Sequence, residues 1–474
     1  MNILLINPQT PYFIFNKEYY IPSSLLYLAA VLRNNGNNVG ILDLNTFRID
    51  DTIENHNKIL EIYDKIIIDR ISNFHPSLIG ITCLFSGQFP LVLNYSKKIK
   101  EKFINIPIII GGIHPTLFPY EILSDCPSVD YIIIGEGEES IVNLINTIKR
   151  YRYEEFNNDL RQIDGLAYRC NGKVIINPKT SFIANLDGLP LPAYELINLK
   201  DYYHNTNNWH NPKNLPINCS IPIISSRSCP VRCNFCSMYK VMGYKHRKRS
   251  PKNVVDEIEF LYRKYNHRHF SFMDDNLTLE KSHVLDICNE IIKRKLNIQF
   301  ETPNGISTRS LDEEILEALV SAGLVRLSLA IESGSDYIRN KIMGKRLPRK
   351  KIFEIVRLTK RYNSLYVRAF FIMGMPEDNR KTLWETHDMI KEIDVDKPIV
   401  FNLLPFPGTK VFEQALRDDL FIDNVDLDNL WRTDLYLTEN KRFFIKPYDL
   451  EVEELYEFRE RFDKLIIKSQ RHLR

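Results

Sequence analysis

Three cysteines stand close together near the middle of the 474-residue chain. Cys229, Cys233 and Cys236 lie in the stretch SRSCPVRCNFCSMY with the spacing C-x3-C-x2-C. Thiolates are soft ligands, and three of them on one short loop suit one corner of an iron–sulfur cluster. A 4Fe-4S cluster held in this way keeps one iron open for a substrate or cofactor. A zinc site or three reduced thiols are the alternatives, but zinc sites usually pair such cysteines with a second pair, and the sequence shows no partner pair.

The other cysteines and the overall charge narrow the class of protein. Eight cysteines in 474 residues are too few for a disulfide scaffold, which favours a reducing compartment. The net charge of +3 does not mark a nucleic-acid binder. No apolar run approaches the roughly 20 residues that span a bilayer, and the first residues lack a secretion signal. We therefore expect a cytoplasmic protein in which the remaining cysteines are small buried hydrophobes, namely Cys83, Cys126, Cys170, Cys219 and Cys288.

Residues 1–150 alternate short apolar runs with helical patterns. Runs that are apolar on both faces and alternate with helices predict a parallel, doubly wound sheet. A helix is expected over residues 23–36, with Ser23 or Ser24 as its N-cap and Gly36 as its stop. Ligands of such sheets bind at the carboxyl ends of the strands. Those ends carry Asn7-Pro8, Thr82, Gly111-Gly112 and Gly135-Glu136-Gly137-Glu138.

A second alternation begins after a connector that spans residues 151–215 and contains a hairpin with Asn171-Gly172 as its turn. Six strand–helix units follow in residues 216–414, which predicts an open or partial barrel. The first of its helices is expected to begin at Pro251 with Ser250 as its cap. Residues 415–474 are expected to form a charged, mainly helical tail.

With this barrel around the cysteine loop, the chain resembles the radical S-adenosylmethionine (SAM) superfamily. Members carry C-x3-C-x2-C after the first barrel strand and an aromatic residue before the third cysteine, which is Phe235 here. Signatures of one branch recur at the strand ends, as FMDD (272–275), TPNGI (302–306), LAIESGS (329–335), FIMGMPED (371–378) and PFPGT (405–409).

The resemblance implies roles for residues at these strand ends. Cys229, Cys233 and Cys236 would ligate three irons of a 4Fe-4S cluster, and SAM would bind the fourth. The residues expected around SAM are Phe235, Asp274, Asp275, Glu332, Ser333 and Met373. For each of them a packing or loop-organising role is the alternative. The basic cluster KHRKRSPK (245–252) is interpreted as a solvated helix start, although Arg249 could pair with an acidic group of a cofactor or substrate.

The N-terminal half resembles the cobalamin-binding domain of the same branch, through PSSLLYLAAVLRNNGNNVGILD, GGIHPTLFPYEIL and VDYIIIGEGEESI. The motif D-x-H-x-x-G, whose histidine ligates cobalt, is absent after the first strand, so cobalamin would lack that ligand. His114 is interpreted as an ordinary loop histidine. The residues expected at cobalamin are Asn7, Ser23, Ser24, Thr82, Ser86, Gly111, Gly112, Gly135, Glu136 and Gly137.

The resemblance implies an enzyme, most simply a methyltransferase. SAM would methylate cobalamin, a second SAM would yield a 5′-deoxyadenosyl radical, and the substrate radical would take the methyl group. A cyclase or rearrangement enzyme without net methylation, and a cobalamin-binding regulatory module without turnover, are the alternatives. The implied partners are a small-molecule, lipid or peptide substrate and an electron donor such as flavodoxin or ferredoxin, with no nucleic acid.

Overall fold

The computed structural model describes residues 1–10, 21–47, 49, 56–150, 156–203, 219–422, 425–432 and 442–470. The chain divides into two compact units. The first comprises Met1–His204, Lys240–Gly243 and Asp426–Asn440, and the second comprises Asn205–Tyr239, Tyr244–Val425 and Lys441–Arg474. Residues 151–155 and 204–215 of the expected connector, and residues 216–218 of the expected barrel, lie outside the described residues.

The first unit is built on a parallel sheet, as the alternating apolar runs predict. Its five parallel strands have the order β2-β1-β3-β4-β5. Their bounds are β1 (Asn2–Asn7), β2 (Asn38–Asp43), β3 (Leu78–Thr82), β4 (Ile108–Gly111) and β5 (Tyr131–Ile133). The order reverses between β1 and β3, and this switch point is where doubly wound sheets bind ligands.

The expected hairpin extends the same sheet. Strand β6 (Leu166–Cys170) pairs antiparallel with β5, and β7 (Lys173–Ile176) pairs antiparallel with β6. The turn residues Asn171 and Gly172 have φ angles of 49° and 74°, the left-handed pair that a tight two-residue hairpin requires. The hairpin is therefore part of the first unit's sheet and covers its β5 edge.

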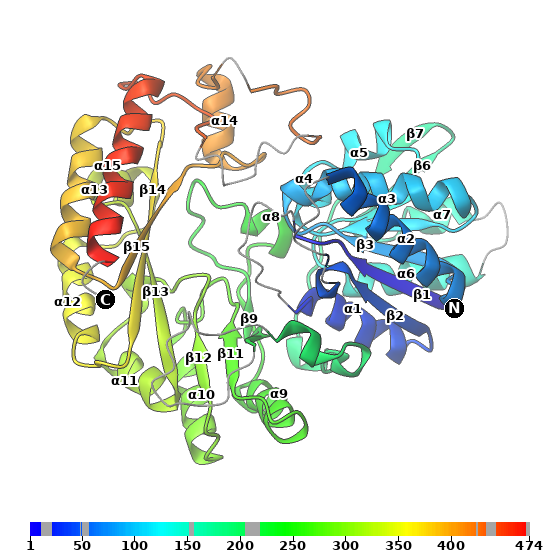
Figure 1. Ribbon diagram of the computed structural model, residues 1–474, viewed down its shortest axis with the longest axis horizontal. Coiled ribbons are helices and arrows are strands. Elements are labelled where there is room, and N and C mark those ends of the chain that lie inside the picture. Colours follow the sequence, from blue (N-terminus) through cyan, green and yellow to red (C-terminus); the bar gives the residue numbers. More distant parts are fainter. Residues whose placement is uncertain are drawn as a thin grey trace. The chain divides into compact units, whose positions relative to one another are not determined.

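Helices follow the strands of the first unit (Figure 1). Helix α1 begins at Ser23, but its N-cap is Pro22, and no side chain caps it. The prediction of Ser23 or Ser24 as the cap is therefore wrong, because the chain turns into the helix one residue earlier, with Ser23 N donating to Ile21 O. The helices are α1 (Ser23–Asn34), α2 (His56–Phe74), α3 (Phe89–Lys102), α4 (Ile113–Leu117), α5 (Pro119–Asp125), α6 (Glu138–Arg150) and α7 (Phe156–Leu160).

The second unit contains the expected open barrel of six parallel strands. They neighbour one another in chain order from β8 to β15. The strands are β8 (Ile221–Ile223), β11 (His269–Phe272), β12 (Gln299–Glu301), β13 (Leu324–Glu332), β14 (Tyr366–Met373) and β15 (Lys397–Asn402). A small antiparallel ladder of β9 (Ser226–Arg227) and β10 (Arg247–Lys248) brackets the cysteine loop.

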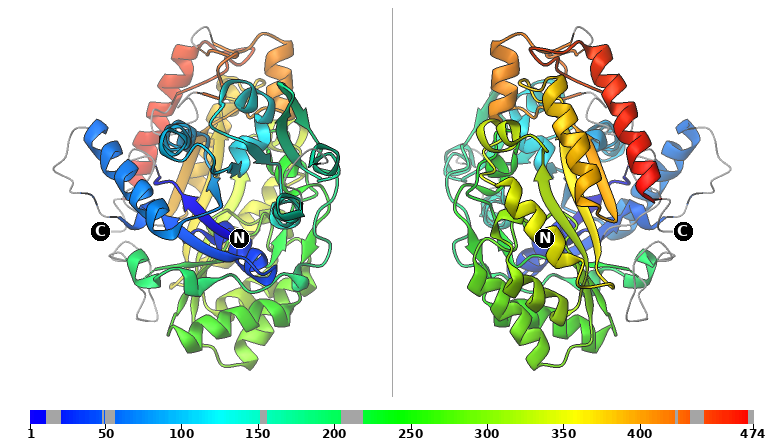
Figure 2. Two further views of the ribbon diagram at one scale, coloured as in Figure 1. Left: turned by 90° about the vertical axis from the view of Figure 1, so that its right-hand side faces the viewer. Right: turned by 90° about the vertical axis from the view of Figure 1, so that its left-hand side faces the viewer.

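Helices between the strands cover one face of this sheet. Ser250 caps α9 by accepting from Asn253 N, and Pro251 is its first residue, as predicted. In the tail, α15 packs against β15 and α13 (Figure 2). The helices are α8 (Met238–Met242), α9 (Pro251–Lys264), α10 (Lys281–Lys293), α11 (Glu313–Ala322), α12 (Arg349–Thr359), α13 (Arg380–Ile393), α14 (Lys410–Arg417) and α15 (Val452–Gln470). None of the helices in the described ranges has the length and apolar character that a membrane crossing needs.

Part of the tail belongs to the first unit through a buried histidine. His114 lies in α4, is fully buried, and has its Nε2 3.0 Å from the carbonyl oxygen of Trp431. The rings of Phe89 and Phe118 lie against it, with centroids 4.6 and 5.0 Å from its own. Burial lowers the pKa of His114 to about 3, so the ring is neutral and its Nε2–H donates to Trp431.

This neutral histidine should make folding pH-dependent. The unfolded chain protonates it near the ordinary histidine pKa of 6.5, whereas the folded chain keeps it neutral down to about 3. Below pH 6.5 the wild type should therefore lose about 1.4 kcal/mol of stability per pH unit relative to a His114→Gln variant, which cannot take up that proton. Urea unfolding of both proteins between pH 7.5 and 5 measures the difference. If the free energies of unfolding of the two proteins changed equally with pH over that range, His114 would not be the buried neutral group described here.

Candidate functional site

The cysteine loop follows β9 in a strained backbone conformation. Ser228, directly before Cys229, has a φ of 71°, and Arg232, directly before Cys233, has a φ of 55°. Left-handed backbone at a residue other than glycine costs on the order of 1–3 kcal/mol and persists only where its surroundings impose it. Within the loop, Cys236 N donates to Cys233 O at 3.1 Å. All three cysteines are half-buried.

Two carboxylates after the end of β11 hold the residues that lead into this loop. The carboxylate of Asp274 accepts from the hydroxyls of Ser225 and Ser226 at 2.7 and 2.5 Å. Asp275 accepts from Ser228 N at 2.8 Å. Burial raises the pKa of Asp275 to about 6, while the hydrogen bond from Ser228 opposes the rise. The two side chains thus hold the entry of the cysteine loop, and their predicted contact with SAM stays a prediction.

The chemistry of the three thiols suits an iron–sulfur cluster. Burial raises the pKa of Cys233 to about 12 and that of Cys236 to about 11, so metal ligation would have to displace their protons. In a 4Fe-4S cluster each of three thiolates binds its own iron. The donor set therefore fits a 4Fe-4S cluster.

Lys345 brings a cation to this site. Its Nζ lies 2.9 Å from Oε1 of Glu332, and its charge lowers the pKa of Cys233 in opposition to burial. Glu332 ends β13 at a register shift and has a φ of 73°, a bulged geometry that is common beside active sites. No sequence motif singles out Lys345. Its place beside the end of β13 depends on the π-helix Tyr337–Ile342 and the turn at Gly344, which return the chain to that strand end.

The other residues predicted at SAM differ in how far they are engaged. Phe235 is half-buried on the loop. The hydroxyl of Ser333 accepts from Ser335 N at 3.1 Å and lies 3.3 Å from that of Thr386. Met373 is fully buried at the end of β14. Phe235 therefore keeps exposed surface for a ligand, whereas Ser333 and Met373 are held within the protein.

Arg249 of the basic cluster has a structural partner. Its guanidinium pairs with Glu257 of α9, and the side chains of both are nearly fully buried. It also donates to the carbonyl of Ile224 at 3.0 Å. The pair joins the start of α9 to the end of β8 and does not need an acidic cofactor.

In the first unit, a buried polar network lies at the carboxyl ends of β1 and β2. Asn7 Nδ2 donates to Asp43 Oδ1 at 2.9 Å, and Tyr202 donates to Asp43 Oδ2 at 2.7 Å. Burial raises the pKa of Asp43, while its hydrogen bonds oppose that rise. This network orders the edge at which doubly wound sheets bind ligands.

The glycines of the neighbouring loops make close contacts within the protein. A Cβ on Gly112 would lie 2.4 Å from the carbonyl oxygen of Cys83, and one on Gly135 would lie 2.9 Å from that of Val241. The carboxylate of Glu136 accepts from Ile183 N at 3.0 Å. These residues therefore pack the loops that follow the strands. For the other residues expected at cobalamin the contact stays a prediction. They are Ser23, Thr82, Ser86, Gly111 and Gly137.

Ser24 fits a bulky ligand with polar substituents at this edge. It lies in the first turn of α1, after β1, and its Oγ is buried without a hydrogen-bond partner among the described residues. A buried hydroxyl without a partner costs on the order of 1–3 kcal/mol. An amide of a corrin ring would supply the missing partner.

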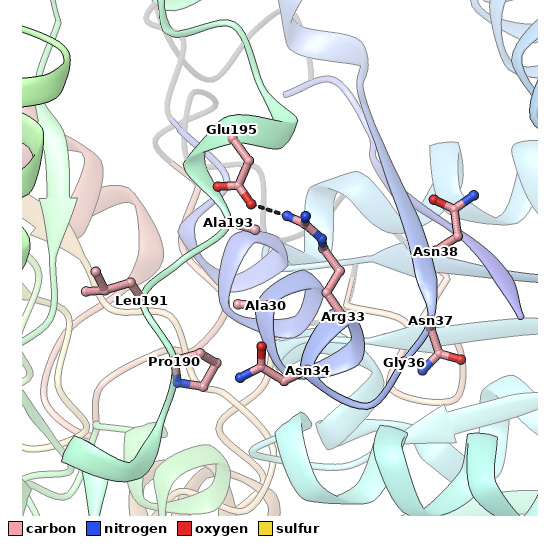
Figure 3. Close-up of a pocket in the computed structure, with 10 residues that line it drawn as sticks. All are labelled: Ala30, Arg33, Asn34, Gly36, Asn37, Asn38, Pro190, Leu191, Ala193 and Glu195. Carbon is pink, nitrogen blue, oxygen red and sulfur yellow. Dashed lines mark hydrogen bonds and ion pairs between the residues drawn. The ribbon is translucent and has the colours of Figure 1, made fainter.

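A cavity of about 650 Å³ lies at the opposite edge of the first unit (Figure 3). It is formed between the end of α1, the start of β2 and the segment 190–195, and Arg33 pairs with Glu195 across it. None of the predicted site residues lines it. The lining residues are Ala30, Arg33, Asn34, Gly36, Asn37, Asn38, Pro190, Leu191, Ala193 and Glu195.

Comparison with known proteins finds two families in one chain. Residues 223–390 match the radical SAM superfamily, and residues 17–145 match the B12 binding domain. The chain is 28% identical over 403 residues to an uncharacterized methyltransferase of Pyrococcus horikoshii, covering 85% of this chain and 80% of that protein. It is 29% identical over 359 residues to the anaerobic magnesium-protoporphyrin IX monomethyl ester cyclase of Cereibacter sphaeroides, covering 75% of this chain and 55% of the cyclase.

A solved structure shares the fold. The radical S-adenosylmethionine methyltransferase TsrM from Kitasatospora setae, with cobalamin and a [4Fe-4S] cluster bound, aligns with a TM-score of 0.68 at 18% identity. The alignment covers 88% of this chain and 75% of TsrM. The order of the two matched domains agrees with the two units and with the cysteine loop described above. The chain therefore carries a B12-binding domain followed by a radical SAM domain.

Proposed function

We propose that this protein is a cobalamin-dependent radical SAM methyltransferase. The observation that carries the proposal is the half-buried cysteine loop at the carboxyl edge of an open parallel barrel, in a chain that also contains a B12-binding domain. Relatives named as methyltransferases support it. They include the protein from Pyrococcus horikoshii and the cytidylyl-2-hydroxyethylphosphonate methyltransferase of Streptomyces wedmorensis, which is 25% identical over 453 residues.

The cysteine loop would hold the cluster. Cys229, Cys233 and Cys236 would each bind one iron as thiolates, and when bound the cluster supplies the electron that splits SAM. Asp274 and Asp275 keep the loop in the conformation that presents the thiols. Lys345 offsets the negative charge of the thiolates. The chain therefore contributes position and charge, and the cofactors contribute the radical chemistry.

SAM would lie at the strand ends around the loop. Glu332 is the strongest candidate to bind the ribose hydroxyls of SAM. The bulge at the end of β13 turns its carboxylate out of the regular alternation of side chains along the strand. Lys345, paired with Glu332, would meet the carboxylate of SAM. Phe235 would pack against the cofactor with its half-buried ring. Cobalamin would lie at the carboxyl edge of the first sheet, near Asn7 and Ser24, without a histidine ligand from the usual motif.

Ring closure without methylation is the second candidate. The specific observation in its favour is the 29% identity to the cyclase of Cereibacter sphaeroides. A small-molecule, lipid or peptide substrate, and a flavodoxin or ferredoxin as electron donor, remain part of the proposal for either reaction.

Anaerobic reconstitution tests the proposed cofactors and reaction class. We expect about four irons and one cobalt per chain, from iron and cobalt analysis after loading with hydroxocobalamin. With SAM and a reductant, a methyltransferase should release S-adenosylhomocysteine together with 5′-deoxyadenosine. Deoxyadenosine without S-adenosylhomocysteine would favour the cyclase or rearrangement reaction. Loading with cobalt but no cleavage of SAM would leave only a binding module.

Removing one thiol should prevent cluster assembly. Cys233→Ala should lose most of the reconstituted iron and its visible absorbance, because two thiolates cannot hold three irons. Cys288→Ala is the matched control, since Cys288 is a buried free cysteine in α10, away from the loop. Full iron retention by Cys233→Ala would refute the ligand assignment.

Removing the cation at the site should weaken SAM binding. Lys345→Met keeps the length of the side chain but loses the charge beside Glu332, and we expect the Kd for SAM to rise about tenfold, the usual scale for one charged hydrogen bond. Lys341→Met is the control, because Lys341 is exposed on the same segment. Equal SAM affinities for the wild type and Lys345→Met, measured by calorimetry on cluster-loaded protein, would contradict this role.

A further inference from the structure

One polar side chain touches a ligand cysteine although no sequence motif assigns it a role. Asn276 follows Asp274 and Asp275 after β11 and is 3% exposed. Its Nδ2 lies 3.8 Å from Sγ of Cys229, within reach of an N–H···S hydrogen bond. This amide gives the sulfur of Cys229 a buried side-chain hydrogen-bond donor. The partial positive charge of the donor would stabilise negative charge on that sulfur.

Both partners of this contact are held in place. The backbone of the Asn276 segment is tied by Met273 N donating to Ile223 O at 2.8 Å and by Leu279 N donating to Asn276 O at 3.3 Å. On the other side, Asp275 holds Ser228, the residue before Cys229. The contact therefore follows from two anchored backbones and not from a loose surface side chain.

The usual structural role of an asparagine at this position does not account for it. Asparagine after a strand commonly accepts a backbone N–H through Oδ1 and so forms a local turn. Here Oδ1 of Asn276 is buried and has no hydrogen-bond partner among the described residues. An unpaired buried acceptor costs on the order of 1–3 kcal/mol. Because Oδ1 makes no compensating bond here, the Nδ2–H contact with Cys229 is the interaction that explains an asparagine at this position.

We infer that Asn276 is a positioning residue that tunes the cluster through Cys229. This inference rests on the proposed function, since it requires the cluster. Its Nδ2–H donates to the Cys229 thiolate and stabilises the extra negative charge of the reduced cluster, which raises the reduction potential. Because the amide is neutral, Asn276 adds no third negative charge to those of Asp274 and Asp275 near the thiolate of Cys229.

Three variants separate this role from a structural one. Asn276→Ala removes the donor, Asn276→Asp replaces it with a negative charge of the same shape, and Thr278→Val is the matched control. Thr278 is 1% exposed on the same segment, and its hydroxyl lies 2.7 Å from that of Ser310, away from the cysteines. Iron content and the midpoint potential, from electron paramagnetic resonance during an anaerobic redox titration, are measured for each reconstituted full-length protein.

We expect all variants to assemble the cluster. Asn276→Ala should lower the equilibrium constant for reduction about tenfold, which is about 59 mV for one electron, and Asn276→Asp should lower it further. Thr278→Val should match the wild type. A midpoint potential of Asn276→Ala equal to that of the wild type, with full iron content, would overturn the inference and leave the proposed function untouched.

A measurement on the wild type covers the case in which the Asn276 variants fail to assemble. The reduced cluster should show a coupled proton in electron–nuclear double resonance that disappears after exchange into deuterated buffer. Its absence in iron-loaded wild type would equally overturn the inference. A wild type that binds no iron would instead overturn the proposed function itself.

Discussion

The site depends on two buried carboxylates that hold a strained loop. Burial of Asp274 and Asp275 removes their carboxylates from water, which costs free energy. Hydrogen bonds from Ser225, Ser226 and Ser228 compensate for part of that cost. The same bonds keep Ser228 in left-handed backbone directly before Cys229. Without them Ser228 would relax toward ordinary backbone and the entry of the cysteine loop would shift. The geometry of the cysteines is therefore set from the neighbouring strand.

Parallel strands explain why residues so far apart in sequence share one site. In each unit every strand of the parallel set ends at the same edge, so the loops after β8, β11 and β13 meet in the second unit. Each contributes a different property there: thiols, carboxylates, and the Glu332–Lys345 pair. The first unit repeats the principle at the ends of β1 and β2, where Asn7 and Tyr202 converge on Asp43. Each edge, taken by itself, is of the kind at which parallel sheets bind ligands.

Electrostatics at the second edge balances burial against charge. Burial raises the pKa of Cys233 and Cys236 and opposes the thiolate form, whereas Lys345 favours it. A metal cluster adds positive charge of its own and deprotonates the thiols that it binds. On the protein's side, Lys345 and the proposed amide of Asn276 favour a negatively charged cluster.

Most of the architecture could be predicted because strand–helix alternation and the cysteine spacing are local patterns. The six barrel strands, the hairpin turn at Asn171-Gly172 and the cap at Ser250 follow from the chemistry of neighbouring residues, and the structure has them. Lys345 and Asn276 could not be found in this way. Their placement beside Glu332 and Cys229 depends on a π-helix and on a strand end that approaches another strand's loop, which the patterns of neighbouring residues do not reveal. Sequence alone determined which strands and helices form and placed three cysteines on one short loop. Tertiary structure decided which polar atoms are buried, and so which charges act on the thiols, because burial depends on what the rest of the chain packs against them.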